Sequence, residues 1–250
     1  MNLSPASLYD PTMSAGDPST ATRDVASASV AWRPQRFSEA GGNVIDPLVE
    51  PLWTGLRVLA LVEGGSASFR DLDGEEIDDF PDIADELVAA ARADRLLVDG
   101  YLTHQPIQDR ETVARRAAAE EPNAAPSIGQ MWFGALGRRR SRENAPTVEQ
   151  TERDPLPVDG DVAIVVVDLV WLDDEPLLSI PLLERKRILE SVLGESRLVR
   201  RGIFVRPPID TWIGSWRSFG FSRLAYKAAN SRYLPGETNP QWTVADLPAR

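Results

Sequence analysis

The chain has 250 residues, of which 42% are hydrophobic and none is cysteine, and its formal net charge at pH 7 is −11. This hydrophobic content suffices for the core of one large or two small domains, while the lack of cysteine excludes disulfides, thiolate zinc sites and cysteine nucleophiles. No apolar run reaches the roughly 18 residues of a membrane-spanning helix, and no secretory signal pattern opens the chain, so we expect a cytoplasmic protein.

Residues 1–30 are rich in Ser, Ala, Thr, Pro and Asp and contain few large apolar side chains. Such a segment cannot bury enough surface to offset the entropy lost on ordering. We therefore predict a disordered tail at residues 1–30 and a folded domain over residues 31–250.

Within that domain, short apolar runs between turn residues predict strands, and apolar residues spaced three or four apart predict helices. The predicted strands are residues 56–61, 66–70, 96–98, 162–167 and 203–205, with a last strand at 224–228. The predicted helices are residues 81–93, 181–193 and 210–217, the last one capped by Asp210. Glu63, Gly64 and Gly65 form a turn signal that makes the first two strands a hairpin. This mixture predicts an α+β fold.

Residues 104–160 interrupt the pattern, and we interpret most of them as a mobile insertion. A short helical piece is predicted at residues 111–121. The basic cluster from Arg138 to Arg142 could contact nucleic acid or an acidic partner, but four arginines alone give little affinity at cellular salt, which favours a solvated loop. The single histidine, His104, lacks the partners of a metal site or catalytic triad and is expected to be a structural or surface residue.

Four segments carry a further pattern. Residues 50–57 read EPLWTGLR, residues 98–101 read VDGY, residues 168–189 read DLVWLDDEPLLSIPLLERKRIL and residues 222–242 read SRLAYKAANSRYLPGETNPQW. In this order they resemble the motifs EPKxDGxR, DGE, DLLxLDG with LPLxERR, and EGVVAK…SxYxPG…W. These motifs belong to the adenylation domain of ATP-dependent DNA ligases, particularly the bacterial branch.

The resemblance implies an ATP-grasp-like adenylation domain with antiparallel sheets flanked by helices. In that family, a lysine attacks the α-phosphate of ATP with Mg²⁺ present, AMP passes to a 5′-phosphate at a nick, and the 3′-hydroxyl seals the nick. A following oligonucleotide-binding barrel (OB-fold) helps to hold DNA, and we expect none within this chain.

The position of the family's nucleophilic lysine is Leu52, which has no lone pair to attack phosphorus. Seven other family positions for charged or aromatic residues also differ; they are Thr54, Leu72, Tyr101, Val167, Ser222, Val244 and Asp246. We therefore expect no catalytic residue and no metal ligand. The residues that the resemblance leaves as vestiges of nucleotide or phosphate binding are Gly55, Arg57, Asp99 and Lys227.

Lysine occurs only at positions 186 and 227. We expect Lys186, on a predicted helix, to be exposed, protonated and hence a poor nucleophile. For Lys227 a solvated lysine is favoured over contact with an anion. For Arg57, an ion pair with a carboxylate and ligand binding remain equally open.

Three functions stay open. The first is a catalytically inactive ligase-like domain, a binding or scaffold module linked to DNA repair, with no cofactor and an unknown protein partner; its acidic charge allows only weak DNA binding. The second is an active ATP-dependent ligase or nucleotidyltransferase that uses ATP and Mg²⁺. The third is a pocket protein for a neutral small ligand, because Leu52, Leu72 and Val167 would make the old nucleotide cleft apolar.

Overall fold

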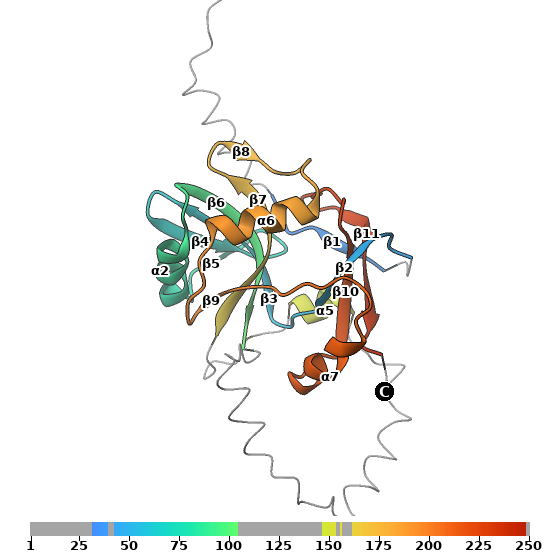
Figure 1. Cartoon of the computed structure of the whole chain (residues 1–250). Coiled ribbons are helices and arrows are strands. Elements are labelled where there is room, and N and C mark those ends of the chain that lie inside the picture. The colour runs from blue at the N-terminus through green and yellow to red at the C-terminus, as the bar shows by residue number, and fades with distance from the viewer. Residues whose placement is uncertain (1–31, 40–42, 105–146, 154–155, 157–161, 249–250) are drawn as a thin grey trace, which may run out of the picture. The chain divides into compact units, whose positions relative to one another are not determined.

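The structure is a computed structural model that describes residues 32–39, 43–104, 147–153, 156 and 162–248 (Figure 1). The compact unit that begins at Arg33 contains two β-sheets and several helices. The described helices are α2 (Pro81–Ala90), α5 (Val148–Glu152), α6 (Leu182–Val192) and α7 (Asp210–Ser218). None of the described helices is long and apolar enough to cross a membrane.

The larger sheet has seven strands. They are β5 (Glu76–Ile77), β4 (Ser66–Arg70), β3 (Leu56–Glu63), β6 (Arg95–Thr103), β7 (Ala163–Leu172) and β8 (Glu175–Pro176) in spatial order, with β9 (Val199–Arg201) paired to β7. Neighbouring strands in this sheet are antiparallel, except that β7 and β9 are parallel. The central strands β6 and β7 are rich in aliphatic residues and buried on both faces, as expected of strands covered on two sides.

The smaller sheet has four strands. They are β1 (Arg36–Ser38), β11 (Thr238–Asp246), β10 (Arg223–Ala228) and β2 (Pro47–Pro51) in spatial order. β10 pairs antiparallel with both neighbours, and β1 pairs parallel with β11. The C-terminal strand β11 is therefore internal to this sheet, and removing it would separate β1 from β10.

The main hydrophobic core lies on the large sheet under α2 and α6. Leu87 of α2 and Leu189 of α6 pack with Val58 and Val98 in one buried cluster. A second cluster joins α7 to the small sheet and contains Val49, Trp216, Phe221 and Leu224. Helices thus supply an apolar cover to each sheet, as amphipathic helices do in α+β folds.

Helix α6 also connects the two sheets. The backbone N–H groups of Leu182 and Leu183 donate to the carbonyls of Ser231 (3.0 Å) and Ala229 (2.9 Å), just beyond β10. The body of the helix packs on β7. The first turn of α6 therefore fixes the end of β10 beside the large sheet.

The predicted α+β class is confirmed, and most strand predictions lie within observed strands. Two are wrong. Residues 203–205 form no strand, since β9 lies earlier, at Val199–Arg201, and Val205 makes only an isolated bridge to Val49. The strand at 224–228 is not the last one, because β11 follows; its sequence, TNPQWTVAD, carries Pro240 and lacks apolar alternation.

Boundaries also differ. α2 ends at Ala90 rather than Ala93, and Asp210 is the first residue of α7, with Ile209 at the N-cap position and no side-chain cap. The predicted tail, the helical piece at 111–121 and the cluster Arg138–Arg142 lie outside the described residues. Within the predicted insertion, Val148–Glu152 form the helix α5. His104 is exposed.

Candidate functional site

Leu52 lies directly after β2. Its backbone N–H donates to the Arg223 carbonyl of β10 at 3.0 Å, and its side chain is buried, with 4% of the residue exposed. The position that the resemblance assigns to a nucleophilic amine is thus an aliphatic side chain fixed in the interior.

Gly55 shapes the turn between β2 and β3. Its φ is +127°, and a Cβ atom there would lie 2.2 Å from the Leu102 carbonyl oxygen. Its N–H donates to the Thr151 carbonyl of α5 at 3.2 Å. Only glycine suits both the backbone conformation and the close approach. The turn brings the start of β3, including Arg57, against α5.

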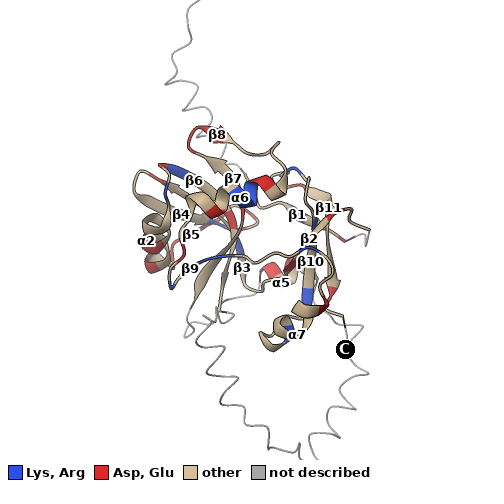
Figure 2. Cartoon of the chain, viewed as in Figure 1, with Lys and Arg blue, Asp and Glu red and all other residues tan. Residues whose placement is uncertain are grey.

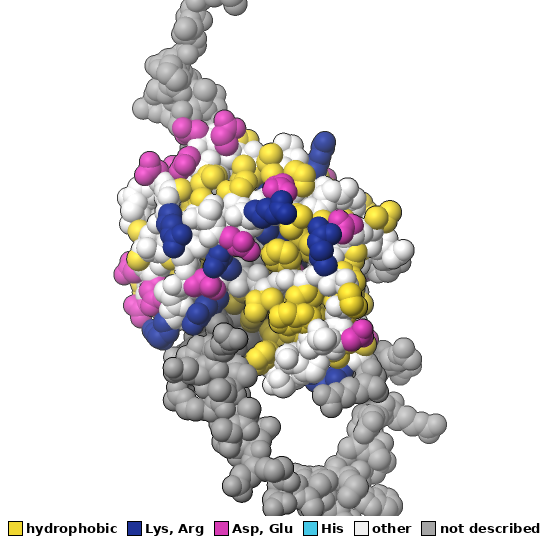
Figure 3. All heavy atoms as spheres, viewed as in Figure 1, with side chains coloured by type: hydrophobic (Ala, Val, Ile, Leu, Met, Phe, Trp, Pro, Cys, Tyr) yellow, Lys and Arg dark blue, Asp and Glu magenta, His cyan; other side chains and the backbone are white. Residues whose placement is uncertain are grey.

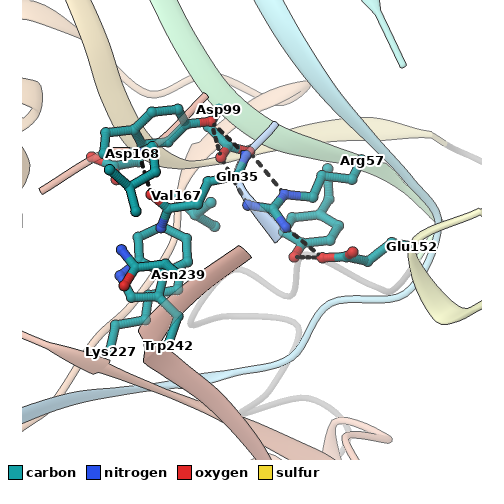
Figure 4. Close-up of polar contacts among 12 residues, drawn as sticks. Gln35, Arg57, Asp99, Glu152, Val167, Asp168, Lys227, Asn239 and Trp242 are labelled. Atoms are coloured by element: carbon teal, nitrogen blue, oxygen red, sulfur yellow. Dashed lines mark hydrogen bonds and ion pairs between the residues drawn. The ribbon is translucent and has the colours of Figure 1, made fainter. Parts of the chain in front are cut away.

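Arg57 forms a fully buried ion-pair cluster. Its Nε and Nη2 donate to the two carboxylate oxygens of Asp99 at 3.1 and 2.9 Å, and its Nη1 donates to Glu152 Oε1 at 2.7 Å (Figure 4). The hydroxyls of Tyr101 and Tyr233 donate to Glu152 (2.9 Å) and Asp99 (2.7 Å). The guanidinium therefore contacts two carboxylates, each of which also accepts a hydrogen bond from a tyrosine hydroxyl.

The electrostatics of this cluster favour charged Arg57 and neutral tyrosines. Burial acts to lower the pKa of Arg57, but Asp99 and Glu152 outweigh it and hold that pKa well above its ordinary range. Burial raises the phenol pKa of Tyr101 and Tyr233 well above the ordinary value; Asp99 acts in the same direction on both, and Glu152 does so on Tyr101. The two tyrosines therefore act as hydrogen-bond donors and not as acids near neutral pH.

A second buried cluster surrounds Glu50 of β2. Lys186 Nζ lies 2.8 Å from Glu50 Oε1, and Lys227 Nζ lies 3.0 Å from Glu50 Oε2. Lys186 also donates to the Val167 carbonyl at 2.7 Å. Burial acts to raise the Glu50 pKa, but the two ammonium groups outweigh it, so this pKa is lowered. Burial is also the largest cause of the lowered Lys227 pKa.

The expected positions of both lysines are therefore wrong. Lys186 is 3% exposed and Lys227 is 1% exposed, whereas the sequence predicts an exposed Lys186 and a solvated Lys227. Glu50 draws both ammonium groups into the interior, since a buried carboxylate needs a cationic partner. For Arg57, the sequence leaves an ion pair and ligand binding equally open, and the structure shows the ion pair.

Phe37 of β1 lies between the two clusters. Its ring centroid is 5.3 Å from the Arg57 guanidinium carbon and 5.7 Å from Lys227 Nζ, and the Trp242 ring lies 4.3 Å from Lys227 Nζ. The Arg57 cluster has one cation and two carboxylates, while the Glu50 cluster has two cations and one carboxylate. The Arg57 cluster thus has an excess negative charge and the neighbouring Glu50 cluster an excess positive charge, so the two together are close to neutral.

The three positions of the neutral-cleft hypothesis, Leu52, Leu72 and Val167, are apolar and buried, whereas Thr54 and Val244 are half-buried and Ser222 and Asp246 are exposed. Val167 packs with Tyr101 and Val165 on one side of the large sheet, whereas Leu52 and Leu72 are buried outside that cluster. The three residues that were expected to line one neutral cleft are therefore not brought together in a single apolar cluster.

The two cations retained from the family motifs have carboxylate partners inside the protein. Arg57 and Lys227, the cations retained from the family motifs, are paired with Asp99, Glu152 and Glu50. Among the described residues, no group of three or more Asp, Glu, His or Cys side chains could hold a metal ion.

Two of these central residues, Glu152 and Phe37, had no sequence signal. Glu152 lies in a segment interpreted as a mobile insertion, and Phe37 precedes the first matched motif. Glu50 is the first residue of the motif at 50–57, so its position two residues before Leu52 could have indicated it.

Asp168 forms a two-point ion pair with Arg185 (Nε at 2.9 Å, Nη2 at 2.7 Å) that fixes α6 on β7.

Comparisons with known proteins agree with this architecture. No protein-family model and no curated protein sequence matches the chain. The ligase domain of M. tuberculosis LigD superposes with a TM-score of 0.56 at 18% identity, covering 87% of this chain and 60% of that one. A mycobacterial DNA ligase D complexed with ATP and MES gives a TM-score of 0.56 at 17% identity, with the same coverage.

This chain therefore spans about 60% of the length of those two structures. At such identities the likeness concerns the fold alone. The order of strands in the two sheets, the motif positions along them and these superpositions lead to one conclusion: the described chain has the fold of the adenylation domain of ATP-dependent DNA ligases.

Proposed function

We propose that this chain is a ligase-like domain without adenylyltransferase activity that serves as a binding module. The observation that carries this proposal is Leu52, a buried hydrocarbon side chain at the position of the nucleophilic amine. Nucleophilic catalysis on the α-phosphate requires an unprotonated amine held in line with phosphorus. Leucine offers no such group.

The internal ion pairs support the same proposal. A nucleotide phosphate would have to compete with Asp99 and Glu152 for Arg57, and with Glu50 for Lys227. Removing one partner of a buried pair costs about 3–5 kcal/mol. Anion binding at either cation would have to offset a cost of this order before it gave any net affinity.

Neither lysine replaces the missing amine. Lys186 and Lys227 both contact Glu50 within 3.0 Å, and Lys186 also donates to a backbone carbonyl. Both amines are buried, and the carboxylate at 2.8–3.0 Å occupies the position that a phosphate would need. A role for either as nucleophile would require the Glu50 cluster to open.

The partner of this module is proposed to be a protein, with any link to DNA repair resting on the fold. The net charge of −11 opposes binding to phosphate backbones. Figure 2 shows Lys and Arg on strands of both sheets and on α6 and α7, interspersed with acidic residues. Extended DNA contact needs a basic face.

The test is covalent labelling. The purified chain is incubated with α-labelled ATP and Mg²⁺ and separated by denaturing electrophoresis, beside an active ATP-dependent DNA ligase. We expect no label on the wild-type chain, since lysine–AMP cannot form at Leu52. Leu52→Lys is also expected to remain unlabelled, because Arg57 and Lys227 stay paired with internal carboxylates. Leu52→Met is the matched variant that lacks an amine. A covalent AMP label on the wild-type chain would contradict the proposal.

A further inference from the structure

A pocket of ≈ 620 Å³ lies beside Leu52, and Pro51 and Trp53 line it from either side of that residue. Its volume lies within the roughly 300–1,000 Å³ of small-molecule sites. Figure 3 shows hydrophobic side chains gathered on this face between α6 and α7, with basic side chains close by. The aromatic lining residues are Trp53, Phe204, Trp212, Trp216, Phe219 and Phe221.

Two pairs of these aromatic residues give the pocket a rigid wall. Trp53 and Phe221 meet edge to face, with ring centroids 4.8 Å apart and an interplanar angle of 90°. Trp212 stacks on Trp216 at 6.0 Å and 30°, and Trp212 remains 39% exposed. Flat apolar ligands pack well between such ring faces and edges.

The pocket also has an unused hydrogen-bond donor. Trp53 Nε1 is shielded from solvent and has no hydrogen-bond partner among the described residues. Buried indole N–H groups normally find an acceptor, because an unpaired buried donor is unfavourable. A ligand with an oxygen or nitrogen acceptor would supply the missing partner.

The charged side chains of the lining differ in burial and in partners. Three basic side chains line the pocket (Lys186, Arg200, Arg201), together with Glu195 and the exposed Glu190. Arg201 is paired with Glu195 at 3.2 Å, and Lys186 shares Glu50 with Lys227. Arg200 is half-buried, and its Nε has no hydrogen-bond partner in the described part of the chain.

We infer that this pocket binds a small organic anion with a flat apolar body, such as an aromatic carboxylate. The rings hold the body, Trp53 donates to an acceptor atom, and Arg200 meets the anionic group. A neutral ligand, as the third sequence hypothesis expected, would leave Arg200 without a counter-ion. This inference goes beyond the proposed function, because it adds a small ligand to the proposed protein partner, and it requires neither the presence nor the absence of adenylyl transfer.

Calorimetric titration with 2-naphthoate tests the inference, with the neutral 2-naphthamide as the matched ligand. A ligand of this size is expected to bind with a Kd on the order of 0.1–1 mM. We expect 2-naphthamide to bind about tenfold more weakly, because it lacks the charge that Arg200 recognises. Equal affinity for the two ligands, or no heat of binding from 2-naphthoate up to about ten times that Kd, would overturn the inference.

Variants locate the binding. Ser215 of α7 lines the pocket, and Ser218 of the same helix does not. We expect Ser215→Trp to abolish 2-naphthoate binding and Ser218→Trp to leave it unchanged. Arg200→Gln should weaken it about tenfold and Trp53→Phe about fivefold. Circular dichroism confirms that each variant is folded. Unchanged affinity in folded Ser215→Trp assigns the binding elsewhere and refutes the site.

Labelling and titration separate the two proposals. If 2-naphthoate does not bind and no AMP label forms, the proposal of an inactive module is supported and the proposed ligand class is rejected. If 2-naphthoate binds and an AMP label also forms, the ligand pocket is supported and the proposal of an inactive module is rejected.

Discussion

The buried cation Arg57 donates hydrogen bonds to side chains inside the protein. Asp99 binds it at two points and Glu152 at a third, while Phe37 and Tyr101 rings lie over the guanidinium. A buried charge with such partners is stable only while the partners stay in place. At the residue scale, the motif arginine therefore acts as the centre of an internal salt-bridge cluster.

Glu152→Gln tests this role. The substitution removes the charge that faces Arg57 Nη1 and accepts from Tyr101, and it should lower the free energy of unfolding by about 2–4 kcal/mol. Urea denaturation measures the loss. Glu149→Gln on the same helix is the control: Glu149 is exposed and pairs with Arg153 at 3.1 Å, so its loss should stay within about 0.5 kcal/mol. Equal losses in the two variants would show that Glu152 is energetically unimportant.

Helix α5 is the element that delivers Glu152 to Arg57. It has only five residues, too few to be stable by itself. Its N-terminus carries a capping box, in which the Thr147 side chain accepts from the Gln150 N–H at 3.2 Å and the Gln150 side chain accepts from the Thr147 N–H at 2.9 Å. The cap, the Glu152 ion pair and the Gly55 hydrogen bond to Thr151 hold it in place.

Thr147→Ala should therefore loosen α5 locally. Loss of the cap costs about 1 kcal/mol, which corresponds to about fivefold faster hydrogen exchange at the α5 amides. Exchange followed by mass spectrometry measures this effect over residues 147–153. Ser191→Ala on α6 removes an exposed side-chain bond to the Ile188 carbonyl and should leave α5 exchange unchanged. No acceleration in Thr147→Ala would mean that tertiary contacts alone hold the helix.

At the scale of the whole folded unit, two sheets meet across a polar interior. The Arg57 cluster and the Glu50 cluster connect segments far apart in the chain, and the Asp168–Arg185 pair joins β7 to α6. The interior carries excess negative charge around Arg57 and excess positive charge around Glu50. Each cluster depends on protonation states that pH can change, so the stability of the unit should depend on pH.

The alkaline limit follows from Tyr101 and Tyr233. Their phenol pKa values are raised in the folded state, chiefly by burial. Above about pH 10 the unfolded chain loses these protons while the folded chain keeps them. Their contribution to stability is therefore present below about pH 10 and lost as pH rises further.

Denaturation of wild type and Tyr101→Phe/Tyr233→Phe between about pH 8 and pH 11 measures this dependence. The double variant should be less stable at pH 8, by about 1–3 kcal/mol for two hydroxyl hydrogen bonds, but should lose less stability as pH rises. Lys227, whose lowered pKa gives the opposite sign, is common to both proteins and cancels in the difference. Parallel pH profiles would contradict the burial of the two phenols as unionised groups.

The sequence by itself determined the α+β class and most strands of the large sheet, and it predicts that Leu52 stands at the position of the family's nucleophile. These properties depend on local apolar patterns and on the order of short motifs, which are written along the chain. The strand β11 could not be predicted in this way, because Pro240 and polar residues break the alternation that marks a strand, while pairing with β1 and β10 stabilises it.

Only the tertiary structure decided which charges meet. Arg57 and Glu152 are 95 positions apart, and Lys227 and Glu50 are 177 apart, so no local pattern relates them. The sequence placed Lys186 and Lys227 in solvent because isolated lysines avoid the interior. Folding reversed this by burying Glu50 between them, since the favourable state of each ionised group depends on partners that long-range contacts bring within 3.0 Å.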